Sequence, residues 1–501
     1  MNKPHGLAFV GQVKVGRVGL RIVAELRRHG FVRSVAGTAG FNVAATAAGG
    51  LGGIIIARVL GPTVRGEYAA VTAWLGVLLI VGGMGQPAAL VYYVAREPLR
   101  AREYVAASRA MMLATGMVTL VAGFLLAPVL AHRLPAVTVG YRIAFGSLIV
   151  AFVGGSFTAS LQARDLHRWN VVRVIQPALA LMAIVVLWGV RRLTLDAALI
   201  VIAATALLQL LLAYCYCRRT GLAPGRARVA LVRPLLGYGV AQIAALTPAT
   251  LNAQLDQLVL SQTVPAADLG RYAIAVSISL LPMPLVTAIG NVALPRLASQ
   301  REVTGANRRL QRLSVFASVG VAAAVLVPLD AVSYWLVPLV FGAAYRGAVP
   351  LLWVLTPGSI FLACGQVTGD LLRGRRQPAV VAWAEGIAAI FTVALLFALL
   401  PLVGVYGAAI ASTVSYGVAL AVMLRRLSRR PPQAGRHRQR RRKLRCLHRE
   451  GHAVGRGHPC PSDPRRWRTE KAGRWGMSGK SAEIPRNSFA VVRKIINCQS
   501  L

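Results

Sequence analysis

Long runs of residues without charged side chains recur along the chain, and each is close to the length needed to cross a membrane. A hydrocarbon core of about 30 Å requires roughly 20 apolar residues in helical form. Backbone groups in lipid must bond within their own segment, which favours helices. The runs cover residues 34–57, 68–95, 110–132, 143–163, 174–190, 197–217, 234–255, 272–295, 313–329, 347–369 and 377–424, the last with a single charge at Glu385.

The last run is long enough for two helices divided near Pro401–Gly404, so the sequence predicts an all-α polytopic membrane protein of about twelve transmembrane helices. Runs 174–190 and 313–329 are at the short limit, and counts of eleven or thirteen stay open. Composition agrees, because only 15% of residues are charged, against about 25% in soluble domains. Lipid is therefore the expected solvent for much of the surface.

The net charge of +41 is spread in a way that argues against nucleic-acid binding. Residues 425–501 hold 22 of the 57 Lys and Arg residues, and the others form short clusters between the apolar runs. Such clusters are typical of loops that set membrane topology. With a cytoplasmic N-terminus, the inner loops carry 20 arginines and the outer loops eight. We therefore predict a multi-pass protein of the plasma or inner membrane, in contact with its lipids, with both termini cytoplasmic and no nucleic-acid partner.

A short repeat divides the chain into two halves. Gly66 and Tyr68 follow the first run, and Gly270 and Tyr272 follow the seventh, at a constant offset of 204 residues. Six helices per half would relate two bundles by an axis along the membrane normal, with a central cavity between them. The predicted parts are a basic cytoplasmic segment 1–33, a six-helix bundle 34–217, a cytoplasmic linker 218–233, a second six-helix bundle 234–424 and a basic tail 425–501.

Several segments resemble a known family of transporters. The sequence ARVLGPTVRGEY at 57–68, with MGQP at 84–87, resembles the polysaccharide flippases of the multidrug/oligosaccharidyl-lipid/polysaccharide exporter superfamily. The segments LDQLVL at 255–260, LVFGAAY at 339–345 and GVYGAAIAS at 404–412 are similar to later parts of the same family. The resemblance covers roughly residues 34–427 and depends on the order and spacing of these segments.

The resemblance implies two six-helix bundles around a cavity that opens alternately to each side. It also implies the substrate, a lipid-linked oligosaccharide moved from the cytoplasmic to the outer leaflet for surface polysaccharide biosynthesis. Other polysaccharide assembly proteins are the further partners it suggests. No cofactor is expected.

Three charged residues are candidates for the transport chemistry. Asp256 directly follows the seventh run, and the repeat offset matches it to Gly52, well inside the first run. We therefore expect Asp256 to lie within the membrane, where a carboxylate would face a cavity and couple transport to an ion. Glu385 is the second ion-coupling candidate. Arg58, which closes the first run, is a candidate for the substrate phosphate, because its guanidinium can bind oxyanions with two parallel hydrogen bonds. The alternatives are an early end of the seventh helix for Asp256, a position at the membrane interface for Glu385 and an interfacial anchor for Arg58.

The tail offers no metal site by its spacing. Two cysteines and three histidines, Cys446, His448, His452, His458 and Cys460, lack the paired spacing of zinc sites. Their surroundings are typical of a disordered extension or of a shifted reading frame, and both interpretations stay open. We predict no metal.

Two other functions fit the sequence less well. A cation-coupled multidrug antiporter of the same superfamily would favour acidic groups in the first six spans, which contain none. A membrane glycosyltransferase or polymerase would need an outer loop with acids for general acid–base chemistry. The longest expected outer connection, Asp330–Arg346, holds one acid. The sequence therefore predicts a transporter and no enzyme.

Overall fold

The structure is a computed structural model that describes residues 17–223, 225–252, 254–298, 305–375 and 377–428, and all regular elements of these residues are helical. Residues 1–16 and 429–501, with the cysteine and histidine set of the tail, lie outside the described residues. The helices are α1 (Arg17–Gly83), α2 (Gln86–Arg96), α3 (Ala101–Leu130), α4 (Pro135–Gly146), α5 (Leu148–Arg164), α6 (Leu166–Gly189), α7 (Leu195–Arg219), α8 (Val232–Asn252), α9 (Leu255–Thr263), α10 (Ala266–Ser279), α11 (Met283–Ala298), α12 (Gly305–Phe341), α13 (Ala348–Gly374), α14 (Pro378–Val403) and α15 (Val405–Ser428). Three short 3-10 segments are η1 (Pro98–Arg100), η2 (Val229–Leu231) and η3 (Ala343–Tyr345).

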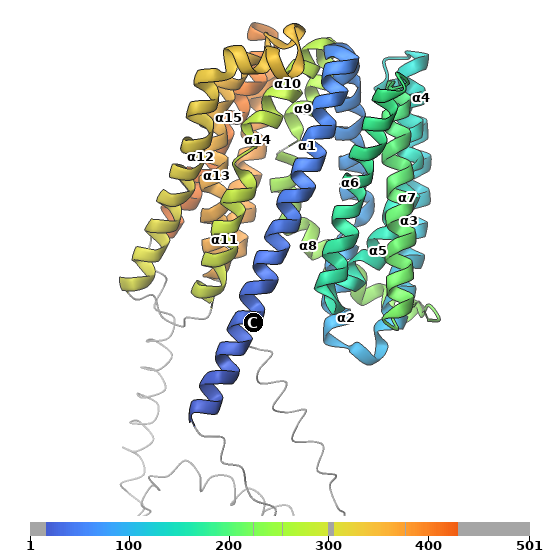
Figure 1. Cartoon of the computed structure of the whole chain (residues 1–501), viewed down its shortest axis with the longest axis vertical. Helices are drawn as coiled ribbons and strands as arrows, with labels where there is room; N and C mark the ends of the chain where they lie inside the picture. The colour runs from blue at the N-terminus through green and yellow to red at the C-terminus, as the bar shows by residue number, and fades with distance from the viewer. Residues whose placement is uncertain (1–16, 224, 253, 299–304, 376, 429–501) are drawn as a thin grey trace, which may run out of the picture. The chain divides into compact units, whose positions relative to one another are not determined.

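Helix α1 contains the predicted span 34–57 and the first part of the predicted span 68–95, joined by a sharp break, and α2 contains most of the rest of the second span. Gly61 has φ 74° and ψ 178° inside this 67-residue element, a conformation that glycine reaches without the steric cost of a Cβ. Pro62 follows, where a missing N–H suits the first turn of a new helix. In Figure 1 the first arm of α1 rises to the end of the helices where α9 and α10 lie, and α2 begins at the opposite end. The chain therefore reverses direction at Gly61.

Nine helices of the described residues are long and apolar enough to cross a membrane, or ten if α10 and the start of α11, which are bent by 43°, count as one span. The prediction of an all-α polytopic membrane protein is confirmed. This count is lower than twelve for two main reasons. Residues Gly40–Gly83 count as one helix in spite of the break at Gly61, and the described apolar helix Val229–Ile243, which includes the start of α8, is too short to count as a span. The predicted division of 377–424 is present, since α14 ends at Val403 and α15 begins at Val405.

One predicted loop is largely helical. The expected outer connection Asp330–Arg346 continues α12 as far as Phe341 and then forms η3. The single acid of this segment, Asp330, does not end the helix, because a carboxylate side chain leaves the backbone hydrogen bonds of α12 intact.

The outer faces of the helices are apolar. Leu125, Ile390 and Phe397 are each at least 70% exposed, and their helices are all candidate membrane spans. Contiguous apolar surface of this kind is unfavourable in water and suits lipid.

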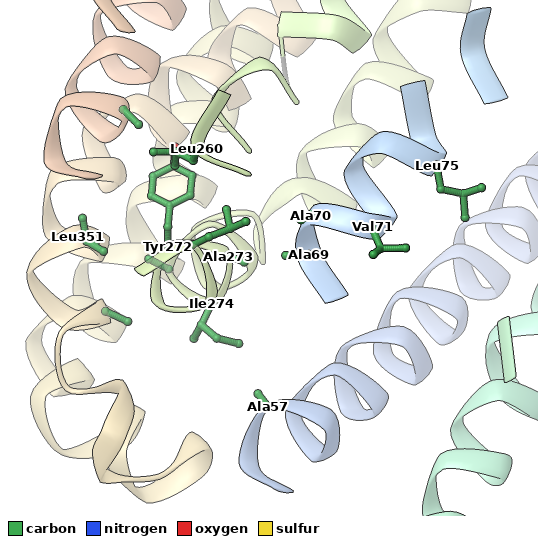
Figure 2. Packing of buried hydrophobic residues seen from close by; sticks show 14 of the residues in the cluster. Ala57, Ala69, Ala70, Val71, Leu75, Leu260, Tyr272, Ala273, Ile274 and Leu351 are labelled. Carbon is green, nitrogen blue, oxygen red and sulfur yellow. The ribbon is translucent and has the colours of Figure 1, made fainter. Parts of the chain in front are cut away.

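The helices form two groups within residues 17–424. Helices α3–α7 pack with one another and with α1, and α10–α13 pack with one another, while α1 with α10 and α2 with α8 make the main connections between the groups. Figure 1 shows α3–α7 on one side of α1 and α11–α14 on the other. Figure 2 shows Ala69, Ala70 and Val71 of α1 near Tyr272, Ala273 and Ile274 of α10, all within one buried apolar cluster.

The contact between α1 and α10 is reciprocal. A Cβ on Gly66 would overlap the carbonyl oxygen of Ala266, and a Cβ on Gly270 would overlap the carbonyl oxygen of Pro62. Both the glycines and the carbonyl residues are separated by 204 residues, the offset seen in the sequence. Only glycine permits two helix backbones to approach this closely.

Candidate functional site

Asp256 lies at a break between two helices and is almost fully buried. α8 ends at Asn252 and α9 begins at Leu255, which places Asp256 in the first turn of α9 with 3% of its surface exposed. The hydroxyl of Tyr272 donates a hydrogen bond of 2.5 Å to the Oδ2 atom of Asp256. Three helices therefore contribute to this carboxyl group, because Ser412 of α15 donates to the same atom at 3.3 Å.

The N-terminus of α9 also favours a negative charge at Asp256. The backbone N–H of Gln257 donates to Oδ1 at 2.7 Å, and the first turn of a helix carries a partial positive charge. Such a carboxyl group can hold a cation or a proton in the interior of a membrane protein.

Glu385 is brought to the same region. It lies on α14, half-buried, near the Asn252 side chain and within range of the charge of Arg373, while the Nδ2 atom of Asn252 makes no hydrogen bond in the described part of the chain. Asn252 is held in place by Thr392, whose hydroxyl donates to the Asn252 Oδ1 atom at 2.6 Å. Tyr416 of α15 lies close enough to both Asp256 and Glu385 for their charges to act on its phenol group. The two carboxyl groups thus belong to one polar region of α8, α9, α10, α14 and α15.

Arg58 lies apart from these carboxyl groups. Its Nη1 atom donates to the carbonyl oxygens of Leu339 at 2.5 Å and Val340 at 3.0 Å. These are carbonyl groups of the last turn of α12, where a cation is favoured by the helix dipole. The geometry favours the anchor interpretation of Arg58 over direct phosphate binding.

Gln262 of α9 makes a hydrogen bond like that of Arg58, to a carbonyl group at the end of a helix, here α3. It lies 204 residues after Arg58, and its Nε2 atom donates to the carbonyl oxygen of Leu130, the last residue of α3, at 3.3 Å. We call these two contacts the end clamps. A third hydrogen bond at the same end joins the Tyr345 hydroxyl to the carbonyl oxygen of Ala57 at 3.0 Å. Each of the three connects one helix group to the other.

A cavity of about 460 Å³ lies between α1 and helices α10, α12 and α13. Arg65 is the only charged residue among the described residues that line it. The Nε atom of Arg65 is buried and has no hydrogen-bond partner in the described part of the chain. Arg65 lies between the predicted runs 34–57 and 68–95, so the sequence predicts a loop at this position. The pair Gly61–Pro62 is the signal that identifies the position of Arg65, because proline favours the first turn of a helix and a helix that begins at Pro62 includes Arg65.

A second cavity, of about 290 Å³, lies between the second arm of α1, α2, α3, α5 and α8. Gln242 is the single side chain with a polar group among its described lining residues.

The polysaccharide biosynthesis protein family matches residues 31–301, which is more than half of the 501 residues. The chain belongs to this family. The amylovoran biosynthesis protein AmsL of Erwinia amylovora is 25% identical to this family member over 162 residues, which are 32% of the chain and 42% of that protein. The alignment thus spans less than half the length of this curated relative.

Solved structures show the fold of the family member. It aligns with an inward-facing multidrug resistance transporter of the MATE family in the MOP superfamily, with a TM-score of 0.64, 13% identity and coverage of 76% of this chain and 94% of that one. It aligns with the lipid II flippase MurJ in an inward closed conformation with a TM-score of 0.64, 12% identity and coverage of 78% and 88%. An outward-facing MATE transporter gives a TM-score of 0.53, with 13% identity and coverage of 79% and 95%.

The protein is therefore a multi-pass membrane protein of polysaccharide biosynthesis with the fold of MOP superfamily transporters. The suspected family is confirmed. Family and fold also agree with the prediction of a transporter and not an enzyme.

Proposed function

We propose that this protein is a flippase that moves a lipid-linked oligosaccharide from the cytoplasmic to the outer leaflet for surface polysaccharide biosynthesis. The observation that carries the proposal is the match to the polysaccharide biosynthesis family in a chain with the fold of the lipid II flippase MurJ. The similarity to a protein of amylovoran biosynthesis supports the same pathway class.

The proposal includes twelve spans in two six-helix bundles, 34–217 and 234–424, joined by the linker 218–233. The two arms of α1, then α3, α4 with α5, α6 and α7, supply six spans. The other six are α8, α10 with α11, α12, α13, α14 and α15. The reciprocal glycine contact of α1 and α10 supports a two-fold relation between the bundles.

Transport by rocking of the bundles requires an end that closes and opens. The end clamps connect the two helix groups at the end of the spans that we assign to the outer side, with both termini of the chain in the cytoplasm. The higher TM-score to the inward-facing than to the outward-facing MATE transporter supports a conformation that is closed to the outside. The clamps would then separate when the protein opens outward.

Removal of the end clamps is expected to open the outer end. Each clamp is worth about 1 kcal/mol, so Arg58→Ala combined with Gln262→Ala should shift the equilibrium toward the outward-open state by about thirtyfold. Labelling of Ala348→Cys, a buried core position, by a membrane-impermeant maleimide added outside cells should rise accordingly. Arg192→Ala, at an exposed arginine outside the clamps, is the control, and equal labelling of clamp and control variants would contradict the gate.

We further propose that Asp256 and Glu385 couple transport to a cation or proton. Their shared polar region, buried among α8–α10 and α14–α15, supports this role. Carboxyl groups within a membrane are energetically costly, and those that occur there mark ion pathways and proton relays.

The rival function is a cation-coupled multidrug antiporter. It is favoured by one observation, the TM-score of 0.64 to a MATE transporter, which equals the value for the flippase. The fold thus does not discriminate between the two activities, whereas the family match favours the flippase.

Deletion of the gene tests the pathway. Cells without the protein should accumulate lipid-linked oligosaccharide in the inner leaflet and lose surface polysaccharide, and the wild-type gene should restore both. Normal surface polysaccharide in the deletion strain, together with a changed sensitivity to organic cations, would favour the antiporter instead.

A further inference from the structure

Two exposed apolar side chains lie on short turns at the end of the helices that is proposed to face the cytoplasm. Leu99 of η1 is fully exposed, and Val229 of η2 is 86% exposed. Figure 1 shows the turn between α2 and α3 at the opposite end of the helices from α9 and α10. We call residues 96–109, 218–223 and 225–233, which carry both turns, the inner platform.

The segment after α7 is fastened to the start of α3. The Nε atom of Arg102 donates to the carbonyl oxygen of Ala223 at 3.1 Å, and the N–H of Gly225 donates to the carbonyl oxygen of Arg102 at 3.1 Å. Leu222 and Leu231 of the same segment are buried in one apolar cluster with residues of α2 and α3. The two parts of the inner platform therefore form one preformed surface.

Ion pairs link the two apolar side chains through their chain neighbours. The carboxylate of Glu103 pairs with Arg100 at 3.1 Å and with Arg228 at 3.2 Å. Arg100 directly follows Leu99, and Arg228 directly precedes Val229. The two exposed apolar side chains are thus held at one site, and a partner that covers them has little of this surface to order.

The inner platform is strongly positive. It has two acids, Glu97 and Glu103, and both already pair with arginine side chains. Positive charge is expected of any cytoplasmic loop, but membrane topology requires neither exposed apolar side chains nor a fastened linker. The nine arginines of the platform are all exposed, and they are Arg96, Arg100, Arg102, Arg109, Arg218, Arg219, Arg226, Arg228 and Arg233.

The position of η1 along α3 argues against lipid as the occupant. Arg109 is the last charged residue before the apolar run 110–132 and marks the edge of the hydrocarbon core. Ala101, where α3 begins, lies about 12 Å further out at a rise of 1.5 Å per residue. The headgroup layer of one leaflet is only about 5–8 Å thick. Leu99 therefore reaches past the headgroups into water.

The rest of this chain does not suit the inner platform either. Residues 1–16 contain two lysines and no acid, and residues 425–501 contain 22 Lys and Arg residues and four acids. A second copy related by a two-fold axis would bring the same arginines against one another, and like charges across an interface are unfavourable. The complementary occupant is an acidic protein of different sequence.

We propose that the inner platform is a docking surface for a cytoplasmic protein that presents acidic side chains around an apolar one. Leu99 and Val229 form the apolar centre of the contact, and the arginines form its charged rim, which is the usual arrangement of protein interfaces. Opposite charges then orient the partner during encounter. The inference goes beyond the proposed flippase activity and shares with it only the orientation of the chain in the membrane.

The test places photoreactive benzoylphenylalanine at one position of the full-length chain in the cells that naturally make it. In place of Leu99 or of Val229, it should give a covalent adduct with one protein on irradiation. In place of Leu125, an exposed position within the candidate span of α3, it should give no such adduct. Mass spectrometry then identifies the partner peptide, which should be acidic.

Charge variants test whether the adduct depends on the proposed rim. Arg226→Glu should lower the yield at Leu99 by about fivefold or more, and Leu99→Asp should lower the yield at Val229 similarly. Arg192→Glu, at an exposed arginine outside the platform, should leave both yields unchanged. Replacement of the partner's acid nearest the cross-link by lysine should restore the yield with Arg226→Glu.

Several results would overturn the inference. These are the absence of a protein adduct at both turns, an adduct with lipid or with a second copy of the chain, a basic partner peptide, and a yield unchanged by Arg226→Glu. Flipping by the purified chain in proteoliposomes, without any partner, is measured in parallel. Normal flipping without a protein adduct refutes the docking surface and leaves the proposed function standing. A charge-dependent adduct in a chain that does not flip lipid refutes the function and leaves the surface.

Discussion

Asp256→Asn is expected to reduce transport by roughly tenfold or more while the protein stays in the membrane. Asparagine has nearly the same shape, and its oxygen can still accept the hydrogen bonds of Tyr272 and Ser412, while the hydrogen bond from the Gln257 N–H is lost because an NH2 group then faces it. It cannot carry the charge or the proton that an intramembrane carboxyl group exchanges. Transport is measured in proteoliposomes with imposed sodium and proton gradients, and the amount of folded protein is measured by size-exclusion chromatography in detergent.

Two matched variants accompany this substitution. Ser412→Ala removes one hydrogen bond to the carboxyl group and keeps its charge, so transport should fall far less. Glu103→Gln changes an acid that pairs with Arg100 and Arg228 away from the polar region, and should transport normally. Wild-type transport by Asp256→Asn would remove this residue from the mechanism.

Gly66→Ala is expected to lower the melting temperature by several degrees, because the added Cβ would overlap a backbone carbonyl group of α10 that cannot move away like a flexible side chain. Overpacking of this kind costs about 1–3 kcal/mol. Gly270→Ala should have a similar effect at the reciprocal contact, and the double variant should show less than the sum, because both changes separate the same pair of helices.

The control for this prediction is Gly365→Ala in α13, where a Cβ would meet nothing within 4 Å. Its helix propensity should rise by about 1 kcal/mol, so its melting temperature should be unchanged or higher. Equal melting temperatures for Gly66→Ala and Gly365→Ala, recorded by tryptophan fluorescence, would contradict the close packing of α1 and α10.

Much of the helical architecture follows from the sequence because lipid imposes two simple requirements, an apolar surface and internal backbone hydrogen bonding. Length and charge therefore locate spans such as α6, α7 and α13 well. They do not locate breaks within apolar sequence. Gly61 reverses the chain inside one continuous element.

The candidate site was harder to predict, because its geometry depends on residues far apart in the chain. Asp256 stands out as an acid at the end of an apolar run that the repeat offset matches to the middle of the first run, but its partner Ser412 lies 156 residues away. Tyr272 was visible as a repeat marker, and its contact with Asp256 emerges only when α9 and α10 pack. Charge alone predicts a loop at Arg65, because a cation suggests a membrane boundary, whereas its place beside a cavity depends on the turn at Gly61.

Flipping of a fluorescent lipid-linked oligosaccharide in proteoliposomes tests the central claim most directly. The purified protein is reconstituted with the labelled lipid in both leaflets, and a membrane-impermeant reductant destroys the fluorophores of the outer leaflet. With the protein present and an ion gradient imposed, inner-leaflet fluorophores should become accessible and the signal should fall well below half of its starting value. A signal that stays near half under every gradient tested, as in protein-free liposomes, would contradict the account.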